Sequence, residues 1–530
     1  MLYKLALIVI LFVLIILPII RMFIFIDHDS IVDVMNSPLF LRALQNSFVS
    51  ASLATIITLS IALVLAWCIQ RTRIRFKGIV SIVLVLPMLI PTISHGMGLV
   101  ILFGNNGVLK NLLDLDFSIY GMWGVIAGSV MYAFPLAFLM IDNVMKYEDS
   151  SPYEAAQVLG IPRWRQLISI TLPYLRKPLI SIVFAVFTWI VTDYGVPLMV
   201  GGKFTTLPVL LYQEVIGQLN FGRGSVYGVI LLIPALIAFV IDVVNRDKGN
   251  AVYVIKRFEL SKNRIRDVFS YLFCGLVTLI VAMPIFAFGL LAFTKKYPAD
   301  MTATFNNIIK TLNQNGGRYF LNSIIIATFV SLIGVALAFV SAYATARMRS
   351  TVSKYLHLIA LTSMAIPGVV LGLSYVLVFK GSIIYGTIGI LIMVNLAHFF
   401  TSPYVMMYNS LTKINENLEA VGHTLGISRL RMIKDVFLPQ SKATILEMIS
   451  YFFINSMITI SAVSFLATTS TRPVSLMINQ FEAQVQLECA AVVSLAILFV
   501  NVLIKGTVYL IRRYDWLNSI HLAREYPTER

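Results

Sequence analysis

The stretch "PYEAAQVLGIPRWRQLISITLPYLRKP", from Pro152 to Pro178, is polar and lies between two long apolar runs. Ser151 and Glu154 fit a capping box, in which a serine caps the helix and a glutamate three residues later returns the contact. Gly160 can then end the short helix in a left-handed conformation. The sequence therefore predicts a short helix, a sharp turn and a second helix that runs to Leu172-Pro173.

A second stretch, "LEAVGHTLGISRLRMIKDVFLPQSKA" from Leu418 to Ala443, resembles the first. Gly426 and Leu438-Pro439 follow Gly160 and Leu172-Pro173 at a constant offset of 266 residues. Further matches recur at offsets of 265 to 276: Pro18 with Pro284, Asn46-Ser47 with Asn322-Ser323, Pro91 with Pro367, and Tyr120-Gly121 with Tyr385-Gly386. The chain is therefore built from two copies of one unit.

The composition indicates an integral membrane protein. Of 530 residues, 58% are hydrophobic and only 12% are charged, whereas a soluble domain has about 25% charged residues. Apolar runs long enough to cross a bilayer recur along the chain. We expect an all-α fold with about twelve transmembrane helices, six in each repeat. The expected spans are about 5–26, 47–69, 78–103, 119–141, 179–200, 226–245, 268–293, 321–346, 355–378, 383–408, 444–467 and 489–511.

The distribution of basic residues predicts the orientation. With the N-terminus inside, 30 of the 41 Lys and Arg residues fall in cytoplasmic segments, so both termini are expected in the cytoplasm. The net charge of +16 is then explained by topology and anionic lipid, and no nucleic-acid partner is expected.

Each repeat has an even number of expected spans, so both repeats should have the same orientation. A pseudo-two-fold axis along the membrane normal would then relate them, with a pathway between them. We place the first repeat at residues 1–250, a cytoplasmic linker at 251–266 and the second repeat at 267–530. The two polar loops are 150–178 and 412–443.

Several function classes lack their motifs. No Gly-x4-Gly-Lys-Ser/Thr loop occurs in the sequence, so the chain is not expected to bind ATP itself. No metal-ligating or catalytic arrangement of side chains can be argued either. We expect a protein that is not an enzyme, with no catalytic residues, no metal site and no directly bound cofactor.

The first polar loop resembles the EAA motif of ATP-binding cassette (ABC) importer permeases. Glu154-Ala155-Ala156, Gly160 and Leu172-Pro173 match that motif throughout. The resemblance implies a type I importer permease fold in a bacterial-type inner membrane, with two permease domains fused in one chain. It also implies two partners: a cytoplasmic ATPase dimer, which uses the ATP and receives this loop in a groove, and an extracytoplasmic solute-binding protein.

The second polar loop departs from this motif. Alignment on Gly426 places Ala420-Val421-Gly422 opposite Glu-Ala-Ala, whereas alignment on the preceding span places Glu419 opposite Glu154. In either case we expect the two loops to couple unequally to the ATPase. The candidate coupling residues are Glu154, Ala155, Ala156, Gly160, Glu419, Ala420 and Gly426.

A substrate pathway is suggested in the fifth expected span of each repeat. Asp193 and Tyr194 lie in "TDYGVPLMVGG", where a glycine and a proline interrupt the span. A charged residue beside broken helix is a pathway candidate. An equally weighted alternative is that Asp193 caps a helix or reaches the outer surface. Ser461 lies in the corresponding region of the second repeat.

The stretch "ITISAVSFL", Ile458 to Leu466, and the fused architecture resemble permeases for ferric iron and for 2-aminoethylphosphonate. Importers of thiamine, polyamine or sulfate type remain alternatives. A secondary transporter of the major facilitator type also has two parallel six-span repeats, but its Gly-x3-Asp-Arg-x-Gly pattern is absent.

Overall fold

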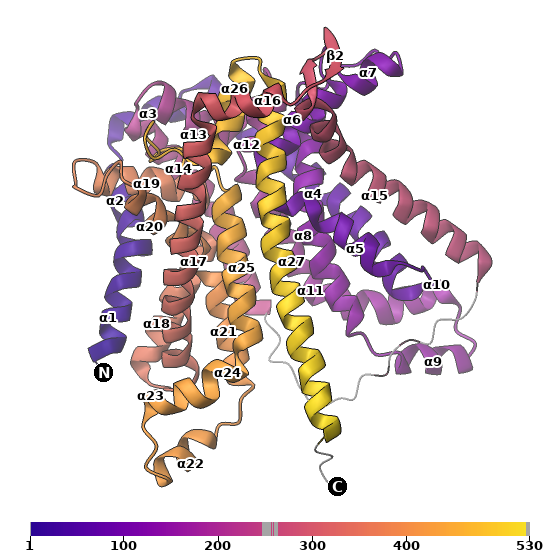
Figure 1. Cartoon of the computed structure of the whole chain (residues 1–530), viewed down its shortest axis with the longest axis vertical. Coiled ribbons are helices and arrows are strands. Elements are labelled where there is room, and N and C mark those ends of the chain that lie inside the picture. Colours follow the sequence, from indigo (N-terminus) through magenta and orange to yellow (C-terminus); the bar gives the residue numbers. More distant parts are fainter. Residues whose placement is uncertain (1, 246–255, 257, 259–262, 526–530) are drawn as a thin grey trace. The chain divides into compact units, whose positions relative to one another are not determined.

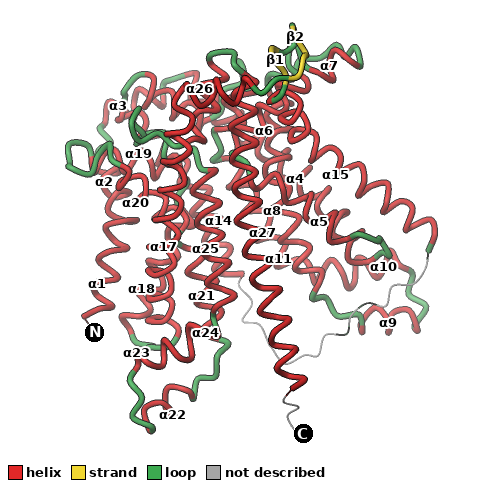
Figure 2. The backbone as a smooth tube through the Cα atoms, in the orientation of Figure 1, coloured by secondary structure: helices red, strands yellow, loops and turns green. Residues whose placement is uncertain are grey.

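A computed structural model describes residues 2–245, 256, 258 and 263–525. These residues are mostly helical, as predicted, and one small antiparallel hairpin joins β1 (Thr294–Lys296) to β2 (Asp300–Ala303) (Figure 2). They form two compact units. Unit 1 comprises Met1–Phe25, Ile309–Met477 and Val493–Arg530, and unit 2 comprises Ile26–Ile308 and Ile478–Val492.

The helices of unit 2 are α3 (His28–Met35), α4 (Pro38–Arg71), α5 (Lys77–Val85), α6 (Thr92–Phe103), α7 (Val108–Leu112), α8 (Met122–Lys146), α9 (Ser151–Val158), α10 (Arg163–Gln166), α11 (Leu172–Val191), α12 (Gly195–Val200), α13 (Leu207–Tyr212), α14 (Phe221–Asn245) and α15 (Arg264–Ala292) (Figure 1).

The helices within unit 1 are α1 (Leu2–Leu11), α2 (Leu17–Ile24), α17 (Gly317–Ala346), α18 (Thr351–Thr362), α19 (Gly368–Phe379), α20 (Ile388–Phe399), α21 (Thr401–Thr412), α22 (Leu418–Thr424), α23 (Arg429–Met432), α24 (Leu438–Gln440) and α25 (Lys442–Ile458). Three helices include or adjoin unit boundaries: α16 (Asn306–Thr311), α26 (Met477–Ala483) and α27 (Leu487–Glu525).

Length and composition confirm a multi-pass membrane protein. Among the described residues, eight helices are long and apolar enough to cross a bilayer, or eleven spans result if each of three bent helix pairs counts once. The expected span 444–467 is wrong in its extent, because α25 ends at Ile458 after 17 residues. The expected span 179–200 is likewise interrupted, because α11 ends at Val191.

The expected spans 78–103 and 355–378 are each broken at an equivalent proline, Pro91 or Pro367. The chain bends by 103° between Lys77–Leu89 and Thr92–Leu112, and by 110° between Thr351–Ala365 and Gly368–Phe379. Proline disfavours helical geometry in the residue before it. Ile90 accordingly has φ −119° and ψ 153°, and Ile366 has φ −111° and ψ 112°.

The Leu-Pro pairs mark a different distortion. Leu17-Pro18, Leu172-Pro173 and Leu438-Pro439 each directly follow a five-residue π-helical segment. Proline lacks an N–H and clashes with the carbonyl four residues back, and one wider turn relieves that clash. The helix predicted to end at Leu172-Pro173 therefore continues into the span, which runs from Trp164 to Val191.

The compact units differ from the sequence repeats in where the first helices pack. α1 and α2 lie in unit 1, where they contact α18 and α19 of the second repeat. α15, the first helix of the second repeat, lies in unit 2 and contacts α5 and α6. Each first helix therefore packs against the other repeat, while the domain boundaries given above remain a prediction from sequence.

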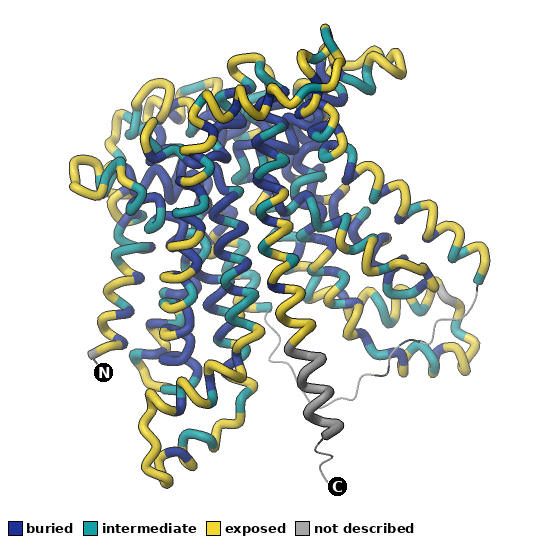
Figure 3. The backbone as a smooth tube through the Cα atoms, viewed as in Figure 1, coloured by how far each residue is buried: buried dark blue, intermediate teal, exposed yellow. Residues whose placement is uncertain are grey.

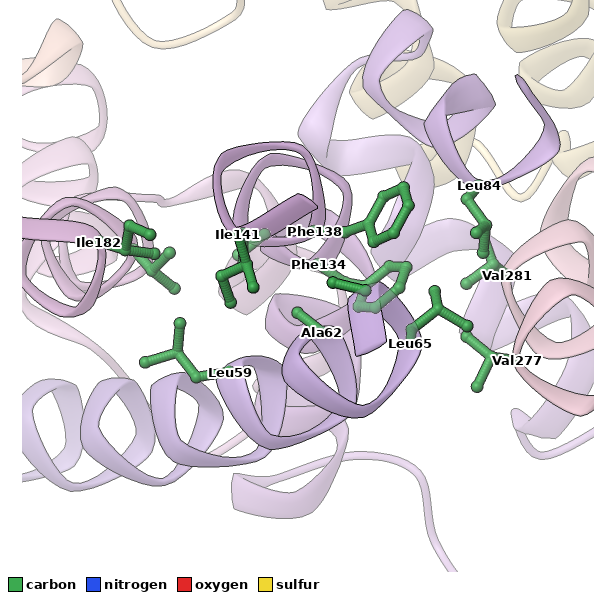
Figure 4. Close-up of a cluster of buried hydrophobic side chains, with 14 of the residues drawn as sticks. Leu59, Ala62, Leu65, Leu84, Phe134, Phe138, Ile141, Ile182, Val277 and Val281 are labelled. Carbon is green, nitrogen blue, oxygen red and sulfur yellow. The ribbon is translucent and has the colours of Figure 1, made fainter. Parts of the chain in front are cut away.

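The buried core of unit 2 shows how α15 is held. Leu65 on α4, Leu84 on α5 and Phe134 on α8 form one cluster with Val277 and Val281 of α15 (Figure 4). Small side chains on the buried face of α4 let α8 approach closely, the usual means of helix packing in membranes. Those small residues are Ala51, Ala54, Ala62 and Ala66.

The repeated Asn-Ser pairs hold the polypeptide that follows the expected spans 179–200 and 444–467. In unit 2, Asn46 Nδ2 donates to the Thr205 carbonyl at 2.9 Å, and the Leu207 N–H donates to Ser47 Oγ at 2.7 Å. In unit 1, Asn322 donates to two carbonyls near residue 471 and Ser323 accepts from the Val474 N–H at 2.8 Å. The side chains thus satisfy backbone groups that a helix start leaves unpaired.

Replacing the buried Ser47 tests this contact. Ser47→Ala leaves the Leu207 N–H without its acceptor, and we expect a loss of about 1–3 kcal/mol of stability. The apparent melting temperature in detergent should fall. Ser60→Ala on the same helix is the control, because its exposed hydroxyl bonds only to the Ile56 carbonyl of its own helix. Equal melting temperatures for both variants would contradict the contact's importance.

Candidate functional site

The first polar loop begins one residue earlier than predicted. The N-cap of α9 is Ser150, not Ser151, and its side chain makes no capping bond to the backbone. Asp149 instead accepts from the Ser151 N–H at 3.1 Å and from the Ser151 hydroxyl at 3.0 Å. The predicted capping box is therefore wrong, because an aspartate upstream takes over the contact.

Glu154 binds side chains rather than the start of the helix. Its carboxylate accepts from Lys256 Nζ at 2.6 Å and from the Ser150 hydroxyl at 2.9 Å. The hydrogen bond from Lys256 is the main reason that the pKa of Glu154 lies below its usual value. Of the two following alanines, Ala155 is exposed and Ala156 is buried.

The turns after α9 and α22 have the same backbone geometry. Gly160 has φ +68° and Gly426 has φ +69°, the left-handed region in which glycine is favoured. The Ile161 N–H donates to the Ala156 carbonyl at 2.9 Å, and the Ile427 N–H donates to the Gly422 carbonyl at 2.8 Å. The donors Ile161 and Ile427 are 266 residues apart, and so are the acceptors Ala156 and Gly422.

This geometry decides between the two alignments of the second loop. Ala156 is the buried residue of α9, and Gly422, 266 residues later, is the buried residue of α22. Alignment on the glycine turn therefore holds without an insertion. Ala420 occupies the position of Glu154, and Glu419 occupies the position of Tyr153.

An arginine at the end of a long helix contacts each loop. In unit 1, Arg347 at the C-cap of α17 forms a two-oxygen ion pair with Glu419 and donates to the Ile414 carbonyl at 2.7 Å. In unit 2, Arg71 at the end of α4 pairs with Glu148 and lies over the Tyr153 ring, 5.1 Å from its centroid.

Arg71 and Arg347 contact equivalent positions of the two loops, but the chemical groups at those positions differ. Glu148 matches Ile414, and Tyr153 matches Glu419, both at an offset of 266. The first loop therefore offers a carboxylate and then an aromatic ring to its arginine, whereas the second offers a carbonyl and then a carboxylate. Either combination offers a guanidinium group a favourable neighbour.

Apolar side chains surround both glycine turns without being covered. Val158 and Leu159 are 88% and 75% exposed, and Leu425 and Leu430 are 69% and 80% exposed. Leu159 and Leu425 occupy equivalent positions. Both loops are largely exposed in Figure 3. Exposed apolar side chains gathered on polar loops are typical of surfaces that bind another protein.

A cavity of about 340 Å³ lies behind α22 within unit 1. Lys4, Arg347, Glu419 and Arg429 are among the residues that line it. Lys4 is itself buried and donates to the hydroxyls of Ser350 and Ser353 at 3.0 and 2.7 Å. Arg347 connects α22 to α17 beside this cavity, and Gly422 of α22 packs against Met432.

Asp193 caps a helix. Its carboxylate accepts from the Val196 N–H at 3.0 Å and the Gly195 N–H at 3.3 Å at the start of α12. It also borders a cavity of only about 10 Å³ lined by Ser47 and Thr206, among others. Capping was one of the two roles considered for Asp193, and its part in a pathway stays a prediction.

The other two pathway candidates, Tyr194 and Ser461, have different surroundings from Asp193. Tyr194 is 2% exposed and stacks on Tyr212 with ring centroids 5.0 Å apart. In unit 1, the Ser461 hydroxyl lies where a Cβ on Gly368 would be, beside His398. The structure brings Asp193 and Tyr194 together in unit 2 and places Ser461 in unit 1.

Sequence reasoning missed the residues that hold the loops. Arg71 and Arg347 are among the basic residues that the sequence assigns to cytoplasmic segments, and they share the 276-residue offset of the Asn-Ser pairs. That shared offset could have identified them. Lys256 has no counterpart and could not have been found in this way. Among the described residues, no group of three or more His, Cys, Asp or Glu could hold a metal ion.

The fold and these loops define a multi-pass helical membrane protein with two repeats, each carrying a polar helix-turn segment after its fourth predicted span. A family model described as "Binding-protein-dependent transport system inner membrane component" matches residues 58–246 and 334–513, more than half of the chain. The chain belongs to this family and is an ABC importer permease. The facilitator alternative is therefore wrong.

Individual relatives cover most of the chain. The ferric transport system permease protein FbpB of Actinobacillus pleuropneumoniae is 25% identical over 541 aligned residues, covering 97% of this chain and 77% of the relative. A putative ferric transport system permease protein FbpB 1 of Haemophilus influenzae is also 25% identical, covering 88% and 78%. The molybdenum transport system permease protein ModB of Azotobacter vinelandii is 29% identical over 33% of this chain and 80% of its own length.

A solved structure of a bacterial alginate ABC transporter with its substrate-bound periplasmic protein is also similar to this chain. It is 19% identical, covers 42% of this chain and 82% of the matched chain, and has a TM-score of 0.36.

Removing Arg347 tests how α22 is held. The Arg347 side chain is 3% exposed and that of Glu419 30% exposed, so Arg347→Gln leaves a largely covered carboxylate and several carbonyls unpaired. We expect a local loss of about 2–3 kcal/mol. Trypsin cleavage after Lys413 should become about tenfold faster or more, because cleavage follows local opening.

The control is Arg349→Gln. Arg349 pairs with Glu416, and both side chains are mostly exposed, so its loss should change cleavage little. Equal cleavage rates for the two variants would show that Arg347 does not hold the loop.

Proposed function

We propose that this permease imports a small polar solute using ATP hydrolysed by a separate cytoplasmic ATPase dimer, which the α9 and α22 loops bind. The observation that carries this proposal is the pair of superposable glycine turns, at φ +68° and +69°, each with an uncovered leucine at the preceding position. Two equivalent docking elements match a partner with two equivalent sockets, as expected for an ATPase dimer.

The connections of the loops support a mechanical role. The helical chain after α9 continues from Trp164 to Val191 without leaving the helix. Arg71 and Arg347 link each loop to the end of α4 or α17. A displacement of either loop would therefore reach at least two spans, because helices transmit strain with little compression.

The basic residues support the orientation. We assign the polar loops and both termini to the cytoplasm of a bacterial-type inner membrane, because 30 of the 41 Lys and Arg residues fall in cytoplasmic segments in that orientation. An extracytoplasmic solute-binding protein would then deliver cargo to the opposite face, in keeping with the family description.

We favour ferric iron or 2-aminoethylphosphonate as the cargo class. The two relatives that cover most of this chain carry ferric transport names, and "ITISAVSFL" resembles permeases of both classes. Relatives named for molybdenum and sulfate transport match shorter parts of the chain. Asp193, Tyr194 and Ser461 are proposed to border the pathway.

Arginine at the two turns tests the coupling role. Gly160→Arg places a long side chain in left-handed backbone at the proposed socket and should abolish uptake. Gly426→Arg should reduce uptake less, because its loop already lacks the glutamate. Uptake in reconstituted vesicles measures both. Gly160→Asn is the control, since asparagine tolerates this conformation. Wild-type uptake by both arginine variants would refute coupling through these turns.

The energy source is tested separately. Uptake that stops on ATP depletion but survives collapse of the ion gradients is expected for the proposed permease. Measurement of labelled solute accumulation in cells, with an uncoupler and an ATP-depleting treatment applied in turn, distinguishes the two sources. Uptake that follows the ion gradient would overturn the ATP-driven reading.

A further inference from the structure

Two described residues of the joining segment between the repeats, Lys256 and Phe258, lie against the first polar loop, and Lys256 forms backbone hydrogen bonds with it. The Ser150 N–H donates to the Lys256 carbonyl at 3.0 Å, and the Lys256 N–H donates to Asp149 Oδ1 at 3.2 Å. Both bonds are made at the two residues immediately before α9. The joining segment is thus paired with the chain where the helix begins.

The side chain of Lys256 extends these contacts into the helix. Its Nζ lies 2.6 Å from Glu154 Oε2, and the other oxygen of that carboxylate accepts from Ser150. Glu154 is the acidic residue of the motif discussed above. One lysine of the joining segment therefore holds both the start of α9 and its first-turn carboxylate.

Phe258 adds an aromatic contact to the helix-end arginine. Its ring lies 3.0 Å from Arg71 Cζ and 5.1 Å, centroid to centroid, from the ring of Tyr153. Arg71 is therefore bounded by two rings and by Glu148. The arginine that contacts the first loop is itself covered by the joining segment.

The second loop has no equivalent of these contacts among the described residues. Ala420 replaces Glu154, so no carboxylate stands at that position, and Arg347 packs instead near Phe437 of its own repeat, 5.2 Å from the ring centroid. The chain passes from the first repeat to the second only once. The extra support is therefore specific to the first loop.

We propose that Lys256 and Phe258 are positioning residues of the first coupling loop. In this role the two linker residues contribute to transport, in addition to connecting the two repeats. By fixing the start of α9, they reduce the ordering that must occur when the ATPase binds. This inference rests on the proposed function for its consequence in transport, while the contact itself is tested independently.

The first test measures α9 in the permease alone. A spin label on Gln157→Cys, an exposed position, reports the mobility of the helix, and the native Cys68, Cys274 and Cys489 are buried. We expect Lys256→Gln with Phe258→Leu to increase the mobile fraction of the label about threefold or more. Arg264→Gln, which removes one exposed charge nearby, is the matched control and should leave the spectrum unchanged.

The second test measures transport with the ATPase and binding protein in liposomes. Maximal uptake should fall about threefold for Lys256→Gln and about tenfold for the double variant. The concentration of loaded binding protein that gives half-maximal uptake should not change. Lys256→Arg and Phe258→Trp keep the charge and the ring, and each should restore uptake to within about twofold of wild type.

Two results would overturn the inference. Unchanged label mobility in the double variant would show that the joining segment does not hold α9. Raised mobility with normal or increased uptake would show that the contact does not position the loop for coupling. If wild-type uptake does not depend on ATP, the proposed function fails, whereas the mobility measurement still decides whether the contact exists.

Discussion

The requirement that every backbone polar group find a partner within the protein constrains this structure most strongly. No water in the hydrocarbon core can replace a missing hydrogen bond. The chain nevertheless breaks its helices at Pro91 and Pro367. At other breaks, in the segments that follow α12 and α25, Ser47 and Ser323 on the long helices α4 and α17 accept from the Leu207 and Val474 N–H groups, where helical structure begins again. Ser47 and Ser323 thus have a structural role in the spans.

The two polar loops share one backbone geometry although their side chains differ. Both loops have a short helix, one buried small residue and a left-handed glycine, and both are contacted by the arginine that ends a long helix. A guanidinium group can pack on a ring or donate to a carboxylate or a carbonyl. The loop residues could therefore diverge while the arginine kept its position. The two loops differ in the side chains that contact this shared backbone.

Fusion of two permease units in one chain adds contacts that, in the part of the chain that the structure describes, only the first loop receives. Lys256 contacts Glu154, the acidic residue of the motif, and Phe258 contacts the neighbouring Tyr153 and Arg71. The exchange of first helices acts on a larger scale, because α15 completes the buried core of α4, α5 and α8. Each repeat therefore depends on elements that come from the other.

The sequence by itself determined the membrane class, most span positions, the twofold repetition and the conformation at Gly160, because apolar periodicity and local backbone preferences act over a few residues. Pro91 and Pro367 were visible as repeated residues, but their bends of 103° and 110° needed packing against other helices. Only the tertiary structure decided that Ala420 is the equivalent of Glu154, that Asp193 caps α12, and that Lys256 reaches Glu154. These outcomes depend on contacts between residues far apart in the chain, which side-chain packing and hydrogen-bond satisfaction select and local sequence does not encode.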